Sequence, residues 1–126
     1  SELERYLAEE AARRGITRVP EFQPEKGHVY RSDHFVFAQA GVPALYLKTG
    51  IDDLDGGIAA GQAREAEYVA QRYHQAGDNY TPGVQLGAGL EVVDLLYAIG
   101  ERLANETTFP NWNEGNGFRA VRDRSR

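Results

Sequence analysis

A continuous apolar run, Val42–Leu47 (VPALYL), lies between Gly41 and Gly50. A short uninterrupted apolar run between glycines is typical of a strand buried on both faces of a sheet. A predicted helix that ends at Gly41 precedes it, and this order favours a layered α/β architecture. One convincing strand does not form a sheet by itself. We therefore predict an α/β fold of which this chain holds only part.

Helical periodicity predicts the remaining elements. Ser1 and Glu4 have the spacing of a capping box at the start of the first helix, and Ser32 is a good N-cap for the second. Glycine-rich stretches at residues 50–62 and 75–85 are predicted loops. The predicted helices cover residues 2–14, 32–40 and 86–104, with a weaker signal over 63–72.

The composition excludes several classes of protein. The 126 residues include 14 Lys and Arg against 19 Asp and Glu, and this net charge of −5 disfavours a nucleic-acid-binding module. No apolar stretch is long enough to span a membrane. There is no cysteine, so disulfides and cysteine-ligated zinc are excluded and the compartment stays open. The chain starts at Ser1 and lacks methionine, so we expect a processed protein or a piece of a larger gene product.

Two segments carry the candidate site residues. Tyr73, His74 and Asp78 lie in the segment YHQAGD, where an imidazole beside a loop can bind a metal with a carboxylate nearby. For this segment taken alone, an exposed or hydrogen-bonded histidine without a metal is a commoner explanation than a metal ligand. The segment Arg31–His34 (RSDH) leaves the same choice between a functional motif and a simple helix N-cap.

Together, RSDHFVFAQAGVPAL and YHQAGD resemble the C-terminal part of a co-catalytic zinc aminopeptidase of metallopeptidase family twenty-eight. This family also includes bacterial aminopeptidases and proteins related to glutamate carboxypeptidase and glutaminyl cyclase. The resemblance runs from about residue 30 to residue 103, and the tail PNWNEGNGFRAVRD looks like the ending of the bacterial branch. It implies that the chain is the C-terminal portion of a three-layer α/β/α zinc-exopeptidase domain, a mixed sheet flanked by helices that is incomplete here. Residues 1–126 would divide into an opening helix and loop (1–29), a motif-bearing core (30–104) and an irregular tail (105–126).

The resemblance also implies roles for single residues. His74 corresponds to the last zinc ligand, and Tyr73 to the tyrosine whose hydroxyl stabilises the oxyanion. Ser32, Asp33 and His34 correspond to a motif at the border of the active site, with a supporting or substrate-positioning role. Asp78 would fix the loop that carries His74.

The complete enzymes of this family bind two zinc ions through two histidines, two aspartates and a glutamate, and a further glutamate is the general base. All of these except the last histidine belong upstream of the matched region, so zinc binding is expected to be incomplete or absent in this chain. Glu9–Glu10 superficially resembles the family's pair of adjacent glutamates, one a ligand and one the general base. The pair lies in the middle of a predicted helix, however, and we interpret it as part of a solvated helix face.

The resemblance therefore implies a metallo-aminopeptidase that cleaves N-terminal peptide bonds, with this chain inactive by itself. Two alternatives stay open: a non-catalytic C-terminal scaffold or oligomerisation module, and a glutaminyl-cyclase-like acyltransferase. The expected partners are a peptide substrate and a second copy of the chain, with no nucleic acid and no membrane. By the same resemblance, the parent protein is expected to be exported to the periplasm or the extracellular space.

Overall fold

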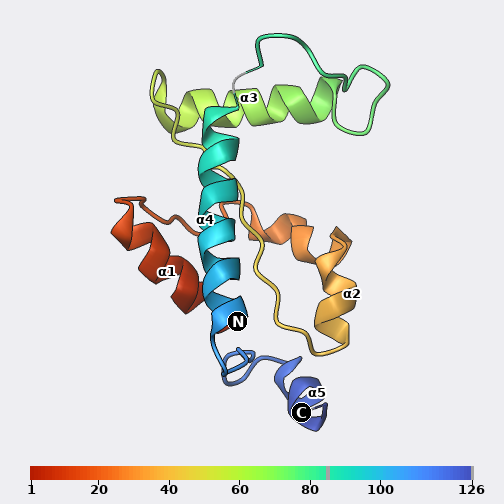
Figure 1. Cartoon of the computed structure of the whole chain (residues 1–126). Helices are drawn as coiled ribbons and strands as arrows, with labels where there is room; N and C mark the ends of the chain where they lie inside the picture. Colours follow the sequence, from red (N-terminus) through yellow and green to blue (C-terminus); the bar gives the residue numbers. More distant parts are fainter. Residues whose placement is uncertain (85, 126) are drawn as a thin grey trace. The chain divides into compact units, whose positions relative to one another are not determined.

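The computed structural model describes residues 1–84 and 86–125, and its regular elements are helices (Figure 1). In chain order they are α1 (Leu3–Arg13), the short 3₁₀ helices η1 (Pro24–Lys26) and η2 (His28–Arg31), α2 (His34–Gln39), α3 (Gly57–Gln71), α4 (Gly87–Asn105) and α5 (Arg119–Arg124). Within this described part, no helix is both long and apolar enough to cross a membrane. The elements belong to two units, Ser1–Leu47 with Val93–Arg126, and Lys48–Val92.

The predicted α/β fold is wrong for the part of the chain that the structure describes. Residues 42–47 lie in an irregular segment between α2 and α3, and the β-pairing present is a single isolated bridge between Asp53 and Gly57. A strand needs a neighbouring strand to satisfy its backbone N–H and C=O groups, and these residues have none beside them. Leu45 and Leu47 instead pack against the helical core through their side chains.

The core of the first unit lies between α1 and the C-terminal half of α4 (Figure 1). Leu3, Tyr6 and Leu7 recur at helical spacing on α1 and meet Leu95 and Ile99 of α4. Each of these side chains is more than nine-tenths buried. Burial of one such side chain contributes about 1.5–3 kcal/mol. The periodic apolar pattern thus predicts both the two helices and the faces that they bury.

The start of α1 differs from the predicted capping box. The N-cap is Glu2, and its side chain makes no capping bond. The α-amino group of Ser1 donates to Glu4 Oε1 at 2.7 Å, while the Ser1 hydroxyl donates to the carbonyl of Ala44 at 3.0 Å. The hydroxyl therefore joins two distant segments of the chain, and the carboxylate pairs with the amino group in place of a backbone amide.

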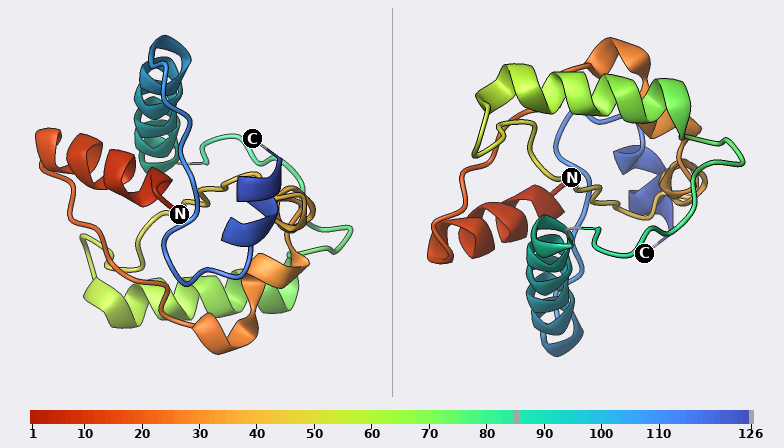
Figure 2. Two further views of the ribbon diagram at one scale, coloured as in Figure 1. Left: turned by 90° about the horizontal axis from the view of Figure 1, so that it is seen from below. Right: turned by 90° about the horizontal axis from the view of Figure 1, so that it is seen from above.

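The tail after α4 joins the start of α1 to the end of α2. Glu2 and Asn111 exchange two hydrogen bonds, Glu2 N to Asn111 O at 2.9 Å and Asn111 N to Glu2 Oε2 at 2.8 Å. The buried indole of Trp112 donates to the Gly41 carbonyl at 3.1 Å. Both views of Figure 2 show the N-terminus beside this part of the tail. The tail contains the helix α5 near its end, and the part between α4 and α5 is fixed at two points of its own unit.

In the second unit, α3 begins inside the stretch predicted as a loop. Within this helix Gly61 has a packing role, because a Cβ atom at this position would collide with the carbonyl of Ile51. Two ion pairs join α3 to the residues before it, Arg64 with Asp53 at 2.5 Å and Lys48 with Glu65 at 3.4 Å.

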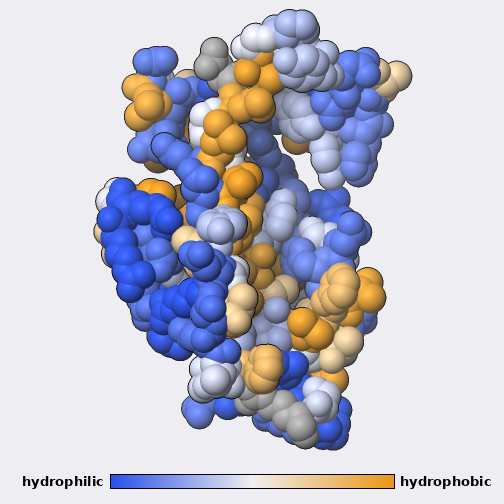
Figure 3. Space-filling model, in the orientation of Figure 1, coloured by the Kyte–Doolittle hydropathy of each residue, from blue (hydrophilic) through white to orange (hydrophobic). Residues whose placement is uncertain are grey.

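Many large apolar side chains remain exposed. In the first unit, Val93, Leu96 and Tyr97 of α4 are 59%, 40% and 69% exposed, and apolar residues follow this helix in Figure 3. On α2, Val36 and Phe37 are also more than half exposed. In this unit α1 therefore covers one side of α4 and leaves an apolar face of the same helix in contact with solvent.

Candidate functional site

The predicted site residues fall in different units. Ser32, Asp33 and His34 belong to the first unit, and Tyr73, His74 and Asp78 belong to the second. The described structure brings residues together within each group.

Tyr73 and His74 lie in the turn that follows α3. The backbone amides of Arg72 and Tyr73 both donate to the carbonyl of Tyr68 at 2.9 Å, and this sharing ends the helix. His74 then adopts a left-handed backbone conformation with φ of 58°, which is uncommon for a residue with a side chain. The two rings stack, with centroids 3.9 Å apart and planes 19° from parallel. The turn thus presents a phenol and an imidazole to solvent as a stacked pair.

Asp78 accepts a hydrogen bond from the Tyr68 hydroxyl at 2.8 Å. Its backbone amide donates to the Gln75 carbonyl at 3.0 Å. The bond to Asp78 raises the pKa of Tyr68, because the nearby carboxylate favours the neutral phenol. Asp78 therefore links the far side of the turn to the last part of α3.

Ser32 is not the N-cap of α2. Its hydroxyl donates to the His28 carbonyl at 2.6 Å and so closes η2, and the N-cap is Asp33, which makes no side-chain capping bond. Asp33 is exposed, and its carbonyl accepts from the amide of Val36.

His34 is the first residue of α2, and its ring stacks on Tyr46 with centroids 5.3 Å apart. The Nε2 atom of His34 is buried and has no hydrogen-bond partner among the described residues. Buried polar atoms usually have hydrogen-bond partners. The Nε2 atom of His34 is thus a polar atom of this motif whose hydrogen bonding is unsatisfied within the described residues.

The donor groups that the structure describes do not fit a complete zinc site. No group of three His, Asp or Glu side chains in residues 1–84 and 86–125 is arranged to hold a metal ion. Zinc sites in proteins use three or four protein ligands. Among the described residues, His74 is therefore a single candidate ligand and not part of a ligand set. Its ring is exposed and stacks on Tyr73.

The adjacent glutamates of α1 have cationic partners. Glu10 is buried and bonds to Arg13 at 2.5 Å and Arg14 at 2.9 Å. The interpretation of Glu9–Glu10 as a solvated face is therefore wrong for Glu10. Its pairing with two arginines, three and four residues further along the chain, compensates the cost of removing its charge from water.

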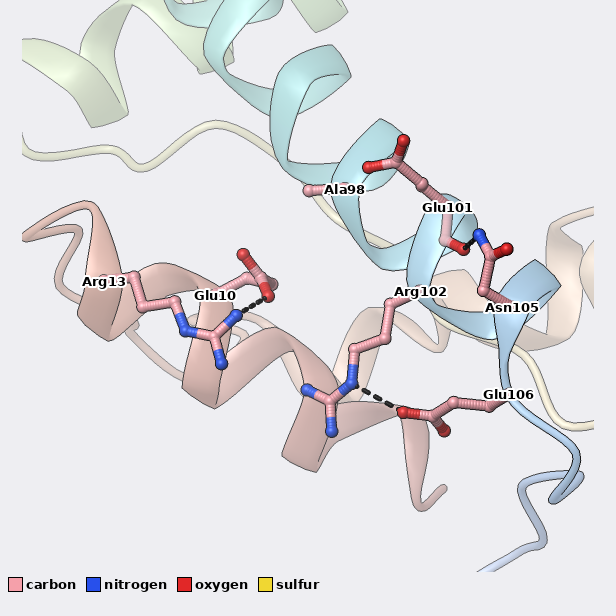
Figure 4. A pocket seen from close by; sticks show the side chains of 7 residues that line it. All are labelled: Glu10, Arg13, Ala98, Glu101, Arg102, Asn105 and Glu106. Atoms are coloured by element: carbon pink, nitrogen blue, oxygen red, sulfur yellow. Dashed lines mark hydrogen bonds and ion pairs between the residues drawn. The ribbon is translucent and has the colours of Figure 1, made fainter.

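A groove of about 490 Å³ lies between α1 and α4 in the first unit (Figure 4). Arg102 is its central cation and donates to Glu9 at 2.5 Å and to Glu106 at 2.8 Å. Tyr6 donates its hydroxyl to the same Glu106 at 2.5 Å. The lining residues are Glu10, Arg13, Ala98, Glu101, Arg102, Asn105 and Glu106.

The contacts of Arg102 and Glu106 shift the pKa values of the residues bonded to one another here. The bond from Tyr6, followed by that from Arg102, lowers the pKa of Glu106, and the bond from Arg102 lowers that of Glu9. The bond to Glu106 raises the pKa of Tyr6. Arg102, Glu9 and Glu106 therefore pair with one another. We interpret this group of charges as a contact that holds α1 and α4 together.

Sequence reasoning missed Tyr68 and Arg102. The ion pair of Arg102 with Glu106 could have been predicted from the sequence, because the two residues are four positions apart at the end of a predicted helix. No local pattern indicates that Tyr68 would reach Asp78, because the bond depends on the path of the turn between them.

Comparison with known proteins gave one finding. The model of Peptidase family M28 matches residues 1–98, a range that includes both candidate segments. Comparisons with curated proteins and with solved structures gave no match.

Proposed function

Because this chain belongs to peptidase family M28, whose members are hydrolases of peptide bonds and generally use zinc, we propose that it is part of a zinc-dependent aminopeptidase. The substrate would be a peptide with a free N-terminus, and the products an amino acid and a shortened peptide. We propose that residues 1–126 are a portion of the catalytic domain of that enzyme.

The stacked pair of Tyr73 and His74 carries this proposal. The imidazole is exposed on a turn whose left-handed conformation is uncommon, and such backbone conformations are concentrated at functional sites. We propose that His74 is the ligand that this chain contributes to the metal centre. The neighbouring Tyr73 hydroxyl would donate to the oxyanion that forms when water attacks the peptide carbonyl.

Ser32, Asp33 and His34 are proposed to have a supporting or substrate-positioning role. The unsatisfied Nε2 atom of His34 supports this assignment, since a bound group could supply the partner that the unit lacks.

The described residues supply too few ligands for a zinc site, so we propose that the chain alone is inactive and that the remaining ligands come from elsewhere in its gene product. This ligand count also favours the competing hypothesis of a non-catalytic scaffold. An activity assay on the whole gene product separates the two.

The test is hydrolysis of amino-acid 4-nitroanilides by the complete gene product in the presence of zinc. We expect Tyr73→Phe to lower kcat by about 10²- to 10³-fold, the usual loss for one oxyanion donor. His74→Ala should lower kcat/KM at least as much and reduce the bound zinc.

His28→Ala is the matched control, because His28 is a histidine outside both candidate segments. It should leave the rate unchanged. Full activity in His74→Ala would refute the assignment of this ligand, and a zinc-loaded wild-type protein without hydrolysis would favour the scaffold.

A further inference from the structure

Tyr68 contacts the turn that carries Tyr73 and His74 in three ways. Its hydroxyl donates to Asp78 Oδ2 at 2.8 Å, beyond the far end of the turn. Its ring lies 6.1 Å from the ring of Tyr73, at an angle of 55°. Its carbonyl accepts the amides of Arg72 and Tyr73. Tyr68, near the end of α3, thus contacts the first residues of the turn, the ring of Tyr73 and the residue Asp78 that follows the turn.

The other bonds of the turn have a shorter reach. Gln75 bonds through its side chain to the Ala70 carbonyl, and Asn79 bonds to the Ala76 carbonyl. The side-chain bond from Tyr68 to Asp78 spans ten residues and encloses most of this segment. Such a bond removes conformations in which the enclosed residues separate from the helix.

The turn needs such a restraint because its site residues are poorly held by packing. Tyr73 is 49% exposed, and His74 is exposed as well. The left-handed conformation of His74 costs free energy that the surroundings must offset.

We propose that Tyr68 is a positioning residue that holds Tyr73 and His74 in their stacked geometry by its hydrogen bond to Asp78. Its relevance to peptide hydrolysis rests on the function proposed above, but its effect on the turn does not. The bond to Asp78 also raises the pKa of the phenol, because the nearby carboxylate disfavours its ionised form.

The experiment is NMR of the histidine ring protons in the 126-residue chain. In the wild type, we expect the stacked ring of Tyr73 to shift the His74 ring signals upfield. With three histidines in the sequence, His28 and His34 provide internal references from the other unit. We expect Tyr68→Phe to remove most of the upfield shift of His74 and to leave both reference signals in place.

Tyr80→Phe is the matched control, because it deletes the hydroxyl of an exposed tyrosine from the same unit. It should leave the His74 signals unchanged. Equal His74 shifts in wild type, Tyr68→Phe and Tyr80→Phe would overturn the proposal.

Variants of Asp78 test the bond itself. Asp78→Asn keeps an acceptor oxygen and should retain the stacked signal, whereas Asp78→Ala should match Tyr68→Phe. The double variant Tyr68→Phe/Asp78→Ala should lose no more than either single variant, as expected for two partners of one bond. Additive losses would show that the two residues act independently and would overturn the proposal.

Activity of the complete gene product separates this inference from the function. There, Tyr68→Phe should lower kcat about tenfold, less than the direct loss of the Tyr73 hydroxyl. If His74→Ala stays active while the NMR shift depends on Tyr68, the proposed function fails and the positioning role stands. If His74→Ala is inactive but the chemical shifts of the His74 ring protons are the same in wild type and Tyr68→Phe, the positioning role is refuted.

Discussion

Gly41 ends α2 in a conformation that suits glycine alone. Its φ is 84°, and the hydrogen bonds from Gly41 to Ala38 and from Val42 to Phe37 form a Schellman motif. A Cβ atom on Gly41 would lie 2.7 Å from the backbone nitrogen of Arg122. Both the turn and the approach of α5 therefore require this glycine.

We predict that Gly41→Ala destabilises the protein by more than the roughly 1–2 kcal/mol that a left-handed alanine costs. Gly15→Ala is the matched control, because Gly15 also has a positive φ of 67° but a Cβ added there would meet no atom within 4 Å. Urea unfolding of both variants measures the difference. Equal losses would show that the contact with Arg122 is not a constraint.

At the scale of elements, Arg102 joins α1 to the end of α4 through Glu9 and Glu106. The pKa of both carboxyl groups is lowered in the folded protein, so their contribution to stability is present above the ordinary glutamate pKa of about 4.3 and is lost as the pH falls below it. Tyr6 responds in the alkaline range instead. Its raised pKa means that its contribution is lost only as the pH rises beyond about 10.

We predict that Arg102→Met lowers the Tm at pH 7 and that its difference from wild type shrinks as the pH falls from about 5 to about 2. The reason is that protonated Glu9 and Glu106 no longer gain from the guanidinium. Circular dichroism melts across this pH range give the measurement. Arg124→Met, which removes an exposed arginine of the same unit, should follow the wild-type pH dependence. A difference that stays constant with pH would contradict the assignment.

The sequence predicted those elements whose information is local. The apolar spacing of Leu3, Tyr6 and Leu7 indicated α1 and its buried face, and α4 was predicted within one residue at each end. The prediction for residues 42–47 was wrong because an apolar run shows that side chains will be buried, but not that a partner strand is present. The start of α3 was missed because its glycines indicate a loop in a local pattern, and the close approach of Ile51 to Gly61 is not visible there.

The candidate site shows the same limit. The resemblance marked both segments, but the Tyr68–Asp78 bond and the buried Nε2 atom of His34 depend on how the chain turns in space.

For the whole molecule, we propose that the exposed apolar face of α4 causes the chain to self-associate. Val93, Leu96 and Tyr97 are 59%, 40% and 69% exposed on consecutive turns, and large exposed apolar patches usually mark contact surfaces. The occupant proposed for this face is a second copy of the chain.

Light scattering tests this proposal over a range of protein concentrations. We predict dimers or larger assemblies for the wild type and a monomer for Val93→Lys/Leu96→Lys. Val19→Lys places a lysine at another exposed apolar site and should not change the mass. A wild-type monomer at all concentrations would exclude self-association.

Trp112 gives the tail a property that is independent of catalysis. It is the one tryptophan of the sequence, it is 8% exposed, and its indole nitrogen bonds to the carbonyl of Gly41, just after the last turn of α2. Indole emission depends on contact with water, so the intrinsic tryptophan fluorescence of the chain originates from the point where the tail meets α2. The protein thus carries its own optical probe of whether its C-terminal segment is docked or released.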